Sequence, residues 1–92
     1  MFKLSQNYPN PFKEYTRIMI NSSFKRDVKL VVWALNGKKI ITLFDDELYP
    51  GYHAFKWDGK NSMGNRVASG IYFCSLIWND DITETKKLIY IQ

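Results

Sequence analysis

The sequence predicts an all-β protein, an immunoglobulin-like antiparallel β-sandwich of about seven strands. Short runs rich in β-branched and aromatic residues alternate with clusters of Gly, Pro, Asn and Asp. No window keeps the apolar spacing of a helix without interruption by turn-forming residues. The 92 residues are 46% hydrophobic and 16% aromatic, which suits one domain with a modest core. We therefore expect residues 1–92 to form a single β-sandwich domain.

The expected strands follow the alternation of apolar and polar residues along the chain. In the run "YTRIMINS" Ile18 and Ile20 share one face, and in "DVKLVVWAL" Val28, Leu30 and Val32 do the same. The run "IYFCSLIW" is continuously apolar, which predicts a central strand covered on both faces. The predicted strands lie, in order, near residues 3–8, 15–22, 27–35, 38–44, 52–57, 71–78 and 82–91.

Turn-forming residues separate these runs. Asn36-Gly37 predicts a two-residue hairpin, because both positions accept positive φ. Pro50-Gly51 suits the centre of a type II turn. A long polar loop, "DGKNSMGNRVASG", precedes the central strand, and "NDD" turns the chain into its last strand.

Charge and hydropathy exclude several classes of protein. The net charge is +4, and the Lys and Arg residues are scattered rather than gathered on one face, which argues against nucleic-acid binding. No run approaches the roughly 18 apolar residues of a membrane span. The opening residues also lack the apolar core and cleavage site of an export signal.

No pattern indicates catalysis. The single cysteine, Cys74, lies in an apolar run, where a thiol acts as a small hydrophobe. The single histidine, His53, has no sequence relationship to it that would indicate a nucleophile and base pair. Neither a phosphate-binding loop nor a nucleophile signature is present. We expect no enzyme activity and no cofactor.

The polar loop and the tryptophans are the candidate ligand sites of the sequence. Oxygen-bearing side chains in "DGKNSMGN" suggest a calcium loop, but counting from Asp58 the EF-hand positions fail. We instead expect Asp58 to hydrogen-bond to its own loop and no metal to bind. A sugar-binding face is the other alternative, for which Trp33 and Trp78 are the better exposed candidates because each lies near a turn, whereas Trp57 belongs to the core.

Four longer stretches carry a family resemblance. In chain order they are "LSQNYPNPF", "VKLVVWALNGKKI", "GYHAFKWDGKNSMGNRVASGIYF" and "TKKLIYI". Together they resemble the C-terminal sorting domain of the bacterial type 9 secretion system, which is similar to the immunoglobulin-like domain of flagellar hook-capping proteins. The resemblance spans residues 4–91, and its most specific parts are "QNYPNPF", "WDG", Gly64 and "VASGIYF".

The resemblance implies a non-catalytic signal that directs an attached cargo protein across the outer membrane. The expected partners are the type 9 translocon, a sortase-like peptidase that cuts the domain off, and a cargo domain fused upstream. The protein would then be secreted or placed on the cell surface, by way of the periplasm. An immunoglobulin-like accessory or capping module that binds protein or polysaccharide is the alternative.

The resemblance also assigns roles to residues. The family-motif positions, expected to be structural, are Asn7, Pro9, Asn10, Pro11, Phe12, Gly37, Trp57, Asp58, Gly59, Gly64, Gly70 and Tyr72. The last strand is the expected recognition element, because a terminal strand can pair with a partner by edge addition. Its candidate contact residues are Lys86, Lys87, Leu88, Ile89 and Tyr90.

Two motif positions carry more detailed expectations. Pro9 and Pro11 bias the residues that precede them toward extended backbone, which predicts a stiff, extended lead-in that packs Phe12 onto the sandwich. Proline also removes backbone donors, so this stretch is not expected to form an interior strand. Gly70 is expected to relieve crowding or to adopt positive φ before the long strand.

Overall fold

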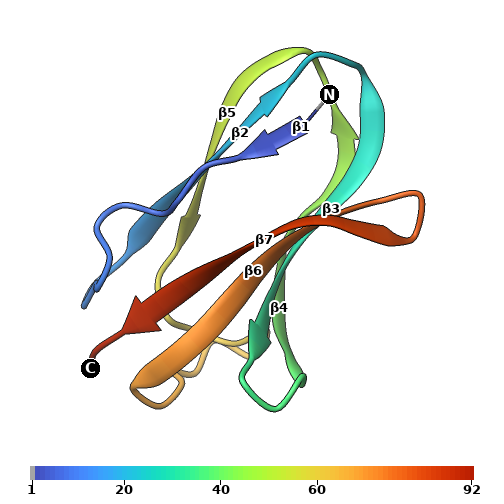
Figure 1. Ribbon diagram of the computed structural model, residues 1–92. Coiled ribbons are helices and arrows are strands. Elements are labelled where there is room, and N and C mark those ends of the chain that lie inside the picture. Colours follow the sequence, from blue (N-terminus) through green and yellow to red (C-terminus); the bar gives the residue numbers. More distant parts are fainter. Residues whose placement is uncertain (1) are drawn as a thin grey trace.

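The computed structural model, which describes residues 2–92, places seven strands in two packed antiparallel sheets (Figure 1). The strands are β1 (Phe2–Leu4), β2 (Thr16–Ser22), β3 (Arg26–Ala34), β4 (Lys39–Leu48), β5 (Gly51–Trp57), β6 (Gly70–Trp78) and β7 (Asp81–Tyr90). One sheet has the order β1-β2-β5 and the other β4-β3-β6-β7. The predicted all-β sandwich is confirmed. Within residues 2–92, no helix is long and apolar enough to cross a membrane.

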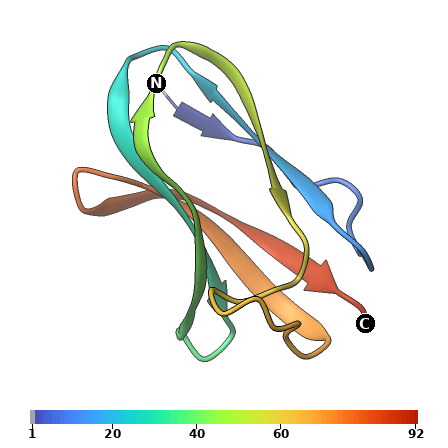
Figure 2. The ribbon, with the colours of Figure 1, turned by 180° about the vertical axis from the view of Figure 1, so that it is seen from behind.

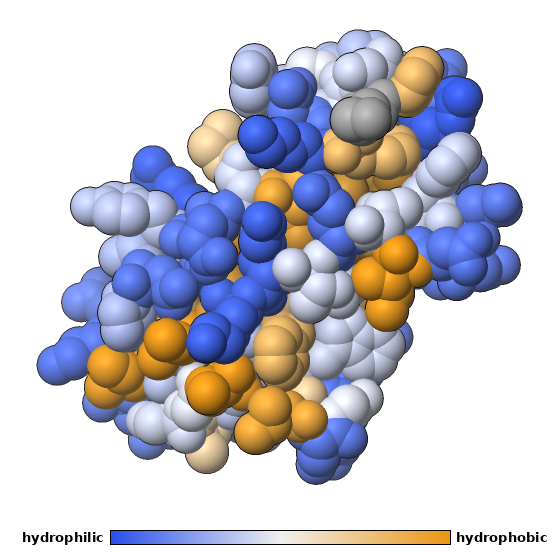
Figure 3. All heavy atoms as spheres, in the orientation of Figure 1, coloured by the Kyte–Doolittle hydropathy of each residue, from blue (hydrophilic) through white to orange (hydrophobic). Residues whose placement is uncertain are grey.

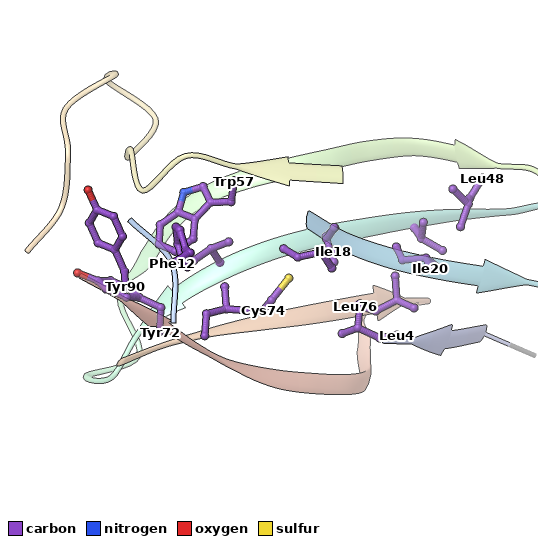
Figure 4. Packing of buried hydrophobic residues seen from close by; sticks show 14 residues of the cluster. Leu4, Phe12, Ile18, Ile20, Leu48, Trp57, Tyr72, Cys74, Leu76 and Tyr90 are labelled. Carbon is purple, nitrogen blue, oxygen red and sulfur yellow. The ribbon is translucent and has the colours of Figure 1, made fainter. Parts of the chain in front are cut away.

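The core lies between the sheets and is formed by alternate residues of each strand. Ile18 and Ile20 of β2 face Leu30 and Val32 of β3, and all four are buried, as the alternation predicts. Figure 4 shows that these side chains continue into a group of aromatic rings at the end of the sandwich where β5 and β7 finish. The same pattern recurs in β5, whose residues Phe55 and Trp57 point inward.

The hairpins differ from the sequence prediction in one respect. Asn36 does not have positive φ; the β3–β4 connection is instead a longer turn in which Gly37, with φ 86°, donates its N–H to Ala34 O at 2.9 Å. The two-residue hairpin with positive φ at both positions lies between β6 and β7. There Asn79 and Asp80 have φ of 55° and 63°, which short polar side chains tolerate.

The stretch "NYPNPF" is bent, not extended as predicted. Residues 9–11 form consecutive bends, and both the Tyr8–Pro9 and Asn10–Pro11 peptide bonds are cis. The first strand is accordingly shorter than the predicted residues 3–8 and ends at Leu4. Tyr8 then makes an isolated antiparallel bridge to Arg17 before the chain turns.

Strand β6 is central, as predicted, because it lies between β3 and β7. Its inner face carries Tyr72, Cys74 and Leu76, all buried. Its outer face is not covered by another layer, and Ile71 there is 40% exposed, so coverage on both faces was predicted wrongly. Viewed from behind, the loop of residues 58–69 runs beside the β3–β4 hairpin before it enters β6 (Figure 2). Ser62 N donates to Ile40 O there.

Candidate functional site

Motifs that lie far apart in the sequence meet at one end of the sandwich. Phe12, Trp57, Tyr72 and Tyr90, called here the aromatic cluster, come from the "NYPNPF", "WDG", "VASGIYF" and last-strand segments (Figure 4). The Phe12 ring centroid is 5.5 Å from that of Trp57 and 5.1 Å from that of Tyr90, and Trp57 is 5.3 Å from Tyr72. These distances are typical of aromatic pairs in cores. The aromatic cluster therefore joins the two sheets at this end.

The bend of "NYPNPF" is held by buried polar side chains. Asn7, 3% exposed, donates through Nδ2 to Thr16 Oγ1 at 2.9 Å and to Pro9 O at 3.3 Å. The Thr16 hydroxyl donates in turn to Pro9 O at 2.8 Å. Because each buried polar group finds a partner, the turn costs little to bury. Thr16 was not singled out in the sequence, where a threonine at the start of a strand carries no distinguishing signal.

After the bend, the chain runs beside the outer edge of β7. Phe12 N donates to Ile89 O at 3.0 Å, and Ile91 N donates to Phe12 O at 2.9 Å. The Asn10 side chain accepts from Ile89 N at 2.9 Å, and Gln6 Nε2 donates to Lys87 O at 2.8 Å. Residues 6–12 thus occupy the edge of β7 near its C-terminal end, and edge addition there would require their displacement.

The "WDG" motif closes the same end from the other side. Trp57 Nε1 donates to Lys60 O at 2.9 Å, and Asp58 Oδ1 accepts from Lys60 N at 3.2 Å, so the carboxylate holds its own loop. Gly59 has φ 76°, and a Cβ at that position would stand 2.5 Å from Tyr90 Cζ. The glycine leaves the space that the tyrosine ring fills.

Arg66 also holds the 58–69 loop over this end of the sandwich. The sequence analysis did not identify it as a structural residue. Its guanidinium donates to the Tyr90 hydroxyl at 2.9 Å and to Asp58 O at 3.3 Å. Val67 N donates to Gly59 O at 2.9 Å, which fixes the loop beside it. An arginine within a polar loop has no sequence signal that distinguishes it from a solvated charge.

The "VASGIYF" segment supplies the floor of the aromatic cluster. Gly70 has φ 155°, and an added Cβ would meet no atom within 4 Å, so its backbone conformation rather than crowding accounts for the glycine. The Tyr72 hydroxyl donates to Ala68 O at 2.6 Å. Burial, and to a smaller extent Tyr90, raise the pKa of Tyr72.

The buried cysteine next to this segment is chemically inert. Burial alone raises the pKa of Cys74 to about 12, so at neutral pH the thiol is protonated and unreactive.

Two motif glycines lie away from the aromatic cluster. Gly37 and Gly64 both have φ 86° and are exposed, and a Cβ on either would meet no atom within 4 Å. They permit the turns of the β3–β4 hairpin and the 58–69 loop, respectively. Pro9 and Pro11 are also exposed, on the bend.

The five candidate contact residues of the last strand differ in how far they are buried. Leu88 and Tyr90 are 0% and 1% exposed and belong to the core, because they alternate inward, so their side chains do not reach a partner. Lys87 and Ile89 point to the outer face of the four-stranded sheet, opposite Phe73 and Ile71 respectively. Lys86 is half-buried.

The structure also places the residues that the sequence suggested as ligand sites. Asn61 Oδ1 accepts from the backbone N–H groups of Met63 and Asn65, and within residues 2–92 no three His, Cys, Asp or Glu side chains gather to hold a metal. Trp78 is 39% exposed, as expected of a residue near a turn. Trp33 is half-buried, and its indole N–H finds no hydrogen-bond acceptor among the described residues.

Comparison with known families identifies the arrangement. A family model described as "Secretion system C-terminal sorting domain" matches residues 6–92, which include every motif of the aromatic cluster. The chain belongs to this family. It is a C-terminal sorting signal of the type 9 secretion system. No curated protein matches.

Solved structures share the fold of the sorting domain. Dimeric latent PorU from Porphyromonas gingivalis superposes with a TM-score of 0.73 at 19% identity, over 99% of this chain and 9% of that one. The alkylpurine DNA glycosylase AlkC of Pseudomonas fluorescens, bound to DNA with an abasic-site analogue, gives 0.63 at 10% identity, over 99% of this chain and 30% of that one. This chain therefore matches only a small part of the length of each of these proteins, and the likeness at such identities concerns the fold alone.

Proposed function

We propose that residues 1–92 form one non-catalytic domain of a longer secreted protein and that the outer-membrane translocon recognises it in the folded state. Cargo reaches the translocon from the periplasm, and a sortase-like peptidase removes the domain after export. The product is secreted or stays on the cell surface. The family assignment supports the sorting role, and the details of route, removal and contact residues are our proposal.

One observation carries the proposal that recognition uses the outward residues of β7. Several motif residues hold β7 in place: Asn10 and Phe12 hydrogen-bond to its edge, and Gly59 leaves space for the Tyr90 ring. Lys87 and Ile89 are thereby presented on a rigid sheet at the end of the domain. A partner that reads a fixed surface gains from such preorganisation because fewer side chains must be ordered on binding.

Export of a reporter tests the sorting role. Residues 3–92 are fused behind a periplasm-directed fluorescent protein and expressed in a strain with a working type 9 system and in a translocon-deficient strain. We expect fluorescence on the surface or in the medium only in the first. A folded, intact reporter that stays in the periplasm of both strains would show that the domain is not a sufficient signal.

A deletion of residues 84–92 is also expected to abolish export, but it removes buried Leu88 and Tyr90 and so destroys the core. The double substitution Lys87→Ala with Ile89→Ser separates recognition from folding, because both side chains lie on the outer face. Retention of this variant in the periplasm, with an unchanged denaturation midpoint, supports recognition through β7. Normal export of this variant would show that the translocon contacts another surface of the domain.

A second candidate function rests on a hollow at the opposite end. Its volume is about 570 Å³, and it is lined by Phe2, Phe24, Trp78, Thr83 and Glu84. The Arg26 guanidinium lies 5.1 Å from the Phe24 ring centroid and 5.8 Å from that of Trp78. Exposed aromatic rings beside charged groups suit the stacking of a sugar, which favours an accessory module that binds polysaccharide.

Affinity electrophoresis in gels that contain polysaccharide tests this alternative. Retardation of the wild-type domain that is lost in Trp78→Ala, and kept in the control Tyr52→Ala, supports a sugar site. Tyr52 is a suitable control because it is 76% exposed and lies on β5 in the other sheet. Equal mobility of all three proteins with and without polysaccharide eliminates it.

A further inference from the structure

We propose that the surface the translocon machinery binds is the outer face of the four-stranded sheet around Trp33, Ile71, Phe73 and Ile89, called here the apolar outer face. The occupant that we infer is a protein surface that presents apolar side chains framed by carboxylates. This inference rests on the proposed function and deepens it, because it replaces a single strand with a surface that crosses three strands.

The strand register places these residues side by side. Trp33 of β3 pairs with Phe73 of β6, and Ile71 of β6 pairs with Ile89 of β7. Directly opposed residues of an antiparallel pair have their side chains on the same face. All four alternate with core residues and so point away from the core. The result is a contiguous apolar area that spans β3, β6 and β7.

The apolar outer face is accessible. Ile71 is 40% exposed, the other three residues are half-buried, and no third sheet covers this face among the described residues. Figure 3 shows hydrophobic side chains gathered at the end of the molecule where β7 finishes, over the neighbouring β6. Leu35 and Ile91, at 69% and 42% exposed, extend the apolar surface at this end. A sandwich normally places polar residues on this side of its strands, so the patch indicates a binding surface.

A shallow hollow adjoins the patch. It is about 330 Å³ in volume and lies between the β3–β4 turn and the start of β6, where Leu35 and Ile71 are among its lining residues. A protruding apolar side chain of a partner would enter such a hollow, as the central residues of protein interfaces do.

The charges around the patch give the chemistry of the partner. Lys39 pairs with Trp33, and Lys87 pairs with Phe73, so exposed ammonium groups stand at both sides of the aromatic row. The segments that meet at this end, residues 6–14, 35–40, 58–72 and 86–92, contain Lys13, Lys38, Lys39, Lys60, Arg66, Lys86 and Lys87 but only two acids, Glu14 and Asp58. Asp58 already lies 3.9 Å from Lys60 Nζ.

Acidic residues collect instead at the other end of the sheet. Asp45, Asp46 and Glu47 lie near the end of β4, Asp80 lies in the β6–β7 turn, and Asp81 begins β7. The apolar outer face therefore lies in a positive field, which attracts a partner with carboxylates around an apolar centre and orients it on approach.

Charge reversal tests the inference in the reporter assay. We expect the Lys39→Glu, Lys87→Glu double variant to be exported about tenfold less, or worse, because like charges would then face each other. The matched control is Lys3→Glu with Lys56→Glu, which changes the net charge equally on exposed lysines of the other sheet. The control is expected to be exported as wild type. If the reversed variant fails to fold, Lys39→Gln with Lys87→Gln takes its place.

An apolar pair of variants tests the patch itself. Ile71→Ser is expected to lower export severalfold, whereas Met19→Ser, equally 40% exposed but on β2, is expected to leave it unchanged. Reduced export of both pairs of variants to the same degree would attribute the effect to folding or solubility and overturn the inference.

The outcomes separate this inference from the proposed function. Export of wild type together with full export of the reversed variant refutes the apolar outer face and leaves the sorting role standing. Failure of wild type to be exported refutes both. Two further experiments use the purified domain. Co-sedimentation with vesicles of phosphatidylethanolamine and phosphatidylglycerol that depends on Lys39 and Lys87 would assign the face to lipid and overturn the inference. Dimerisation in size-exclusion chromatography that depends on the same lysines would assign it to a second copy and likewise overturn the inference.

Discussion

The ring of Tyr90 stands in the space that a side chain at position 59 would need. An ideal Cβ built on Gly59 lies 2.5 Å from Tyr90 Cζ and 2.9 Å from its hydroxyl oxygen. The "WDG" motif and the last strand are thus fitted to each other, although Gly59 and Tyr90 lie 31 positions apart in the sequence. The requirement is steric as well as conformational, which separates Gly59 from the other motif glycines.

The first prediction compares two glycines of similar backbone conformation. Gly59→Ala is expected to lower the free energy of unfolding by about 1–3 kcal/mol more than Gly64→Ala, because both suffer the strain of positive φ but only Gly59→Ala also displaces a buried ring. Urea denaturation followed by tryptophan fluorescence measures both. Equal losses would mean that the Tyr90 ring moves aside at no cost. Adding Tyr90→Leu to Gly59→Ala is expected to restore part of the difference.

The second prediction concerns the side chain that "NYPNPF" places in the core. Phe12→Ala is expected to cost about 3–5 kcal/mol, since Phe12 is 2% exposed and contacts both Trp57 and Tyr90. Tyr8→Ala, in the same motif but 80% exposed, is expected to change stability by less than about 0.5 kcal/mol. The denaturation midpoints of the two variants provide the comparison. A large loss for Tyr8→Ala would contradict the assignment of Phe12 as the residue that anchors the motif.

The third prediction concerns the polar support of the bend. Asn7→Ala leaves the buried Thr16 hydroxyl without its donor and is expected to cost about 1–3 kcal/mol. A double-mutant cycle with Thr16→Val is expected to give a coupling energy of about 0.5–3 kcal/mol. Additive effects of the two substitutions would indicate that the hydrogen bond contributes nothing. Asn10→Ala, whose partner Ile89 N lies near solvent, is expected to cost less.

The fourth prediction is a dependence of stability on alkaline pH. The pKa of the Cys74 thiol is raised from 9.0 to about 12 in the folded domain. As the pH rises, the thiol of the unfolded chain therefore loses its proton at a lower pH than the thiol of the folded domain. The contribution of the protonated thiol is therefore fully present below about pH 9 and is lost as the pH rises toward 12. The urea midpoint of wild type is expected to fall more steeply over this range than that of Cys74→Val.

A labelling experiment gives an independent check of the same thiol. At pH 8 we expect Cys74 to react with a thiol reagent only at the rate of unfolding, because it is 0% exposed. Rapid modification of the folded protein would contradict both the burial and the raised pKa.

The sequence predicted the fold because alternation of residue type determines which face of a strand is buried. This rule placed Ile18 and Ile20 on one face, and the need of a small core for large side chains added Trp57; all three are buried. The rule failed where local geometry decides. Asn36-Gly37 has the composition of a two-residue hairpin, yet the strands continue their pairing only after a longer turn, and Asn79-Asp80 forms the two-residue turn instead.

The sequence identified most residues of the candidate site, but it did not show how they are arranged in space. The motif residues around Phe12 and Trp57 were identified one by one, but no periodicity indicates that they meet at a single cluster with Tyr90. Arg66 and Thr16 escaped notice because their roles depend on distant partners, the Tyr90 hydroxyl and the Asn7 amide. The apolar outer face was hidden for the same reason, since only the register of β3, β6 and β7 brings its four residues together.

The hydrogen bonds between residues 6–12 and the end of β7 have a consequence for biosynthesis. The opening segment finds its partners only after the ribosome has added residues 87–91, so a chain that stops earlier cannot seat Phe12 against Tyr90. A folded domain therefore requires that translation has passed residue 91. A translocon that binds only the folded surface would then not export chains that stop before residue 91, and no separate mechanism would be needed to recognise them.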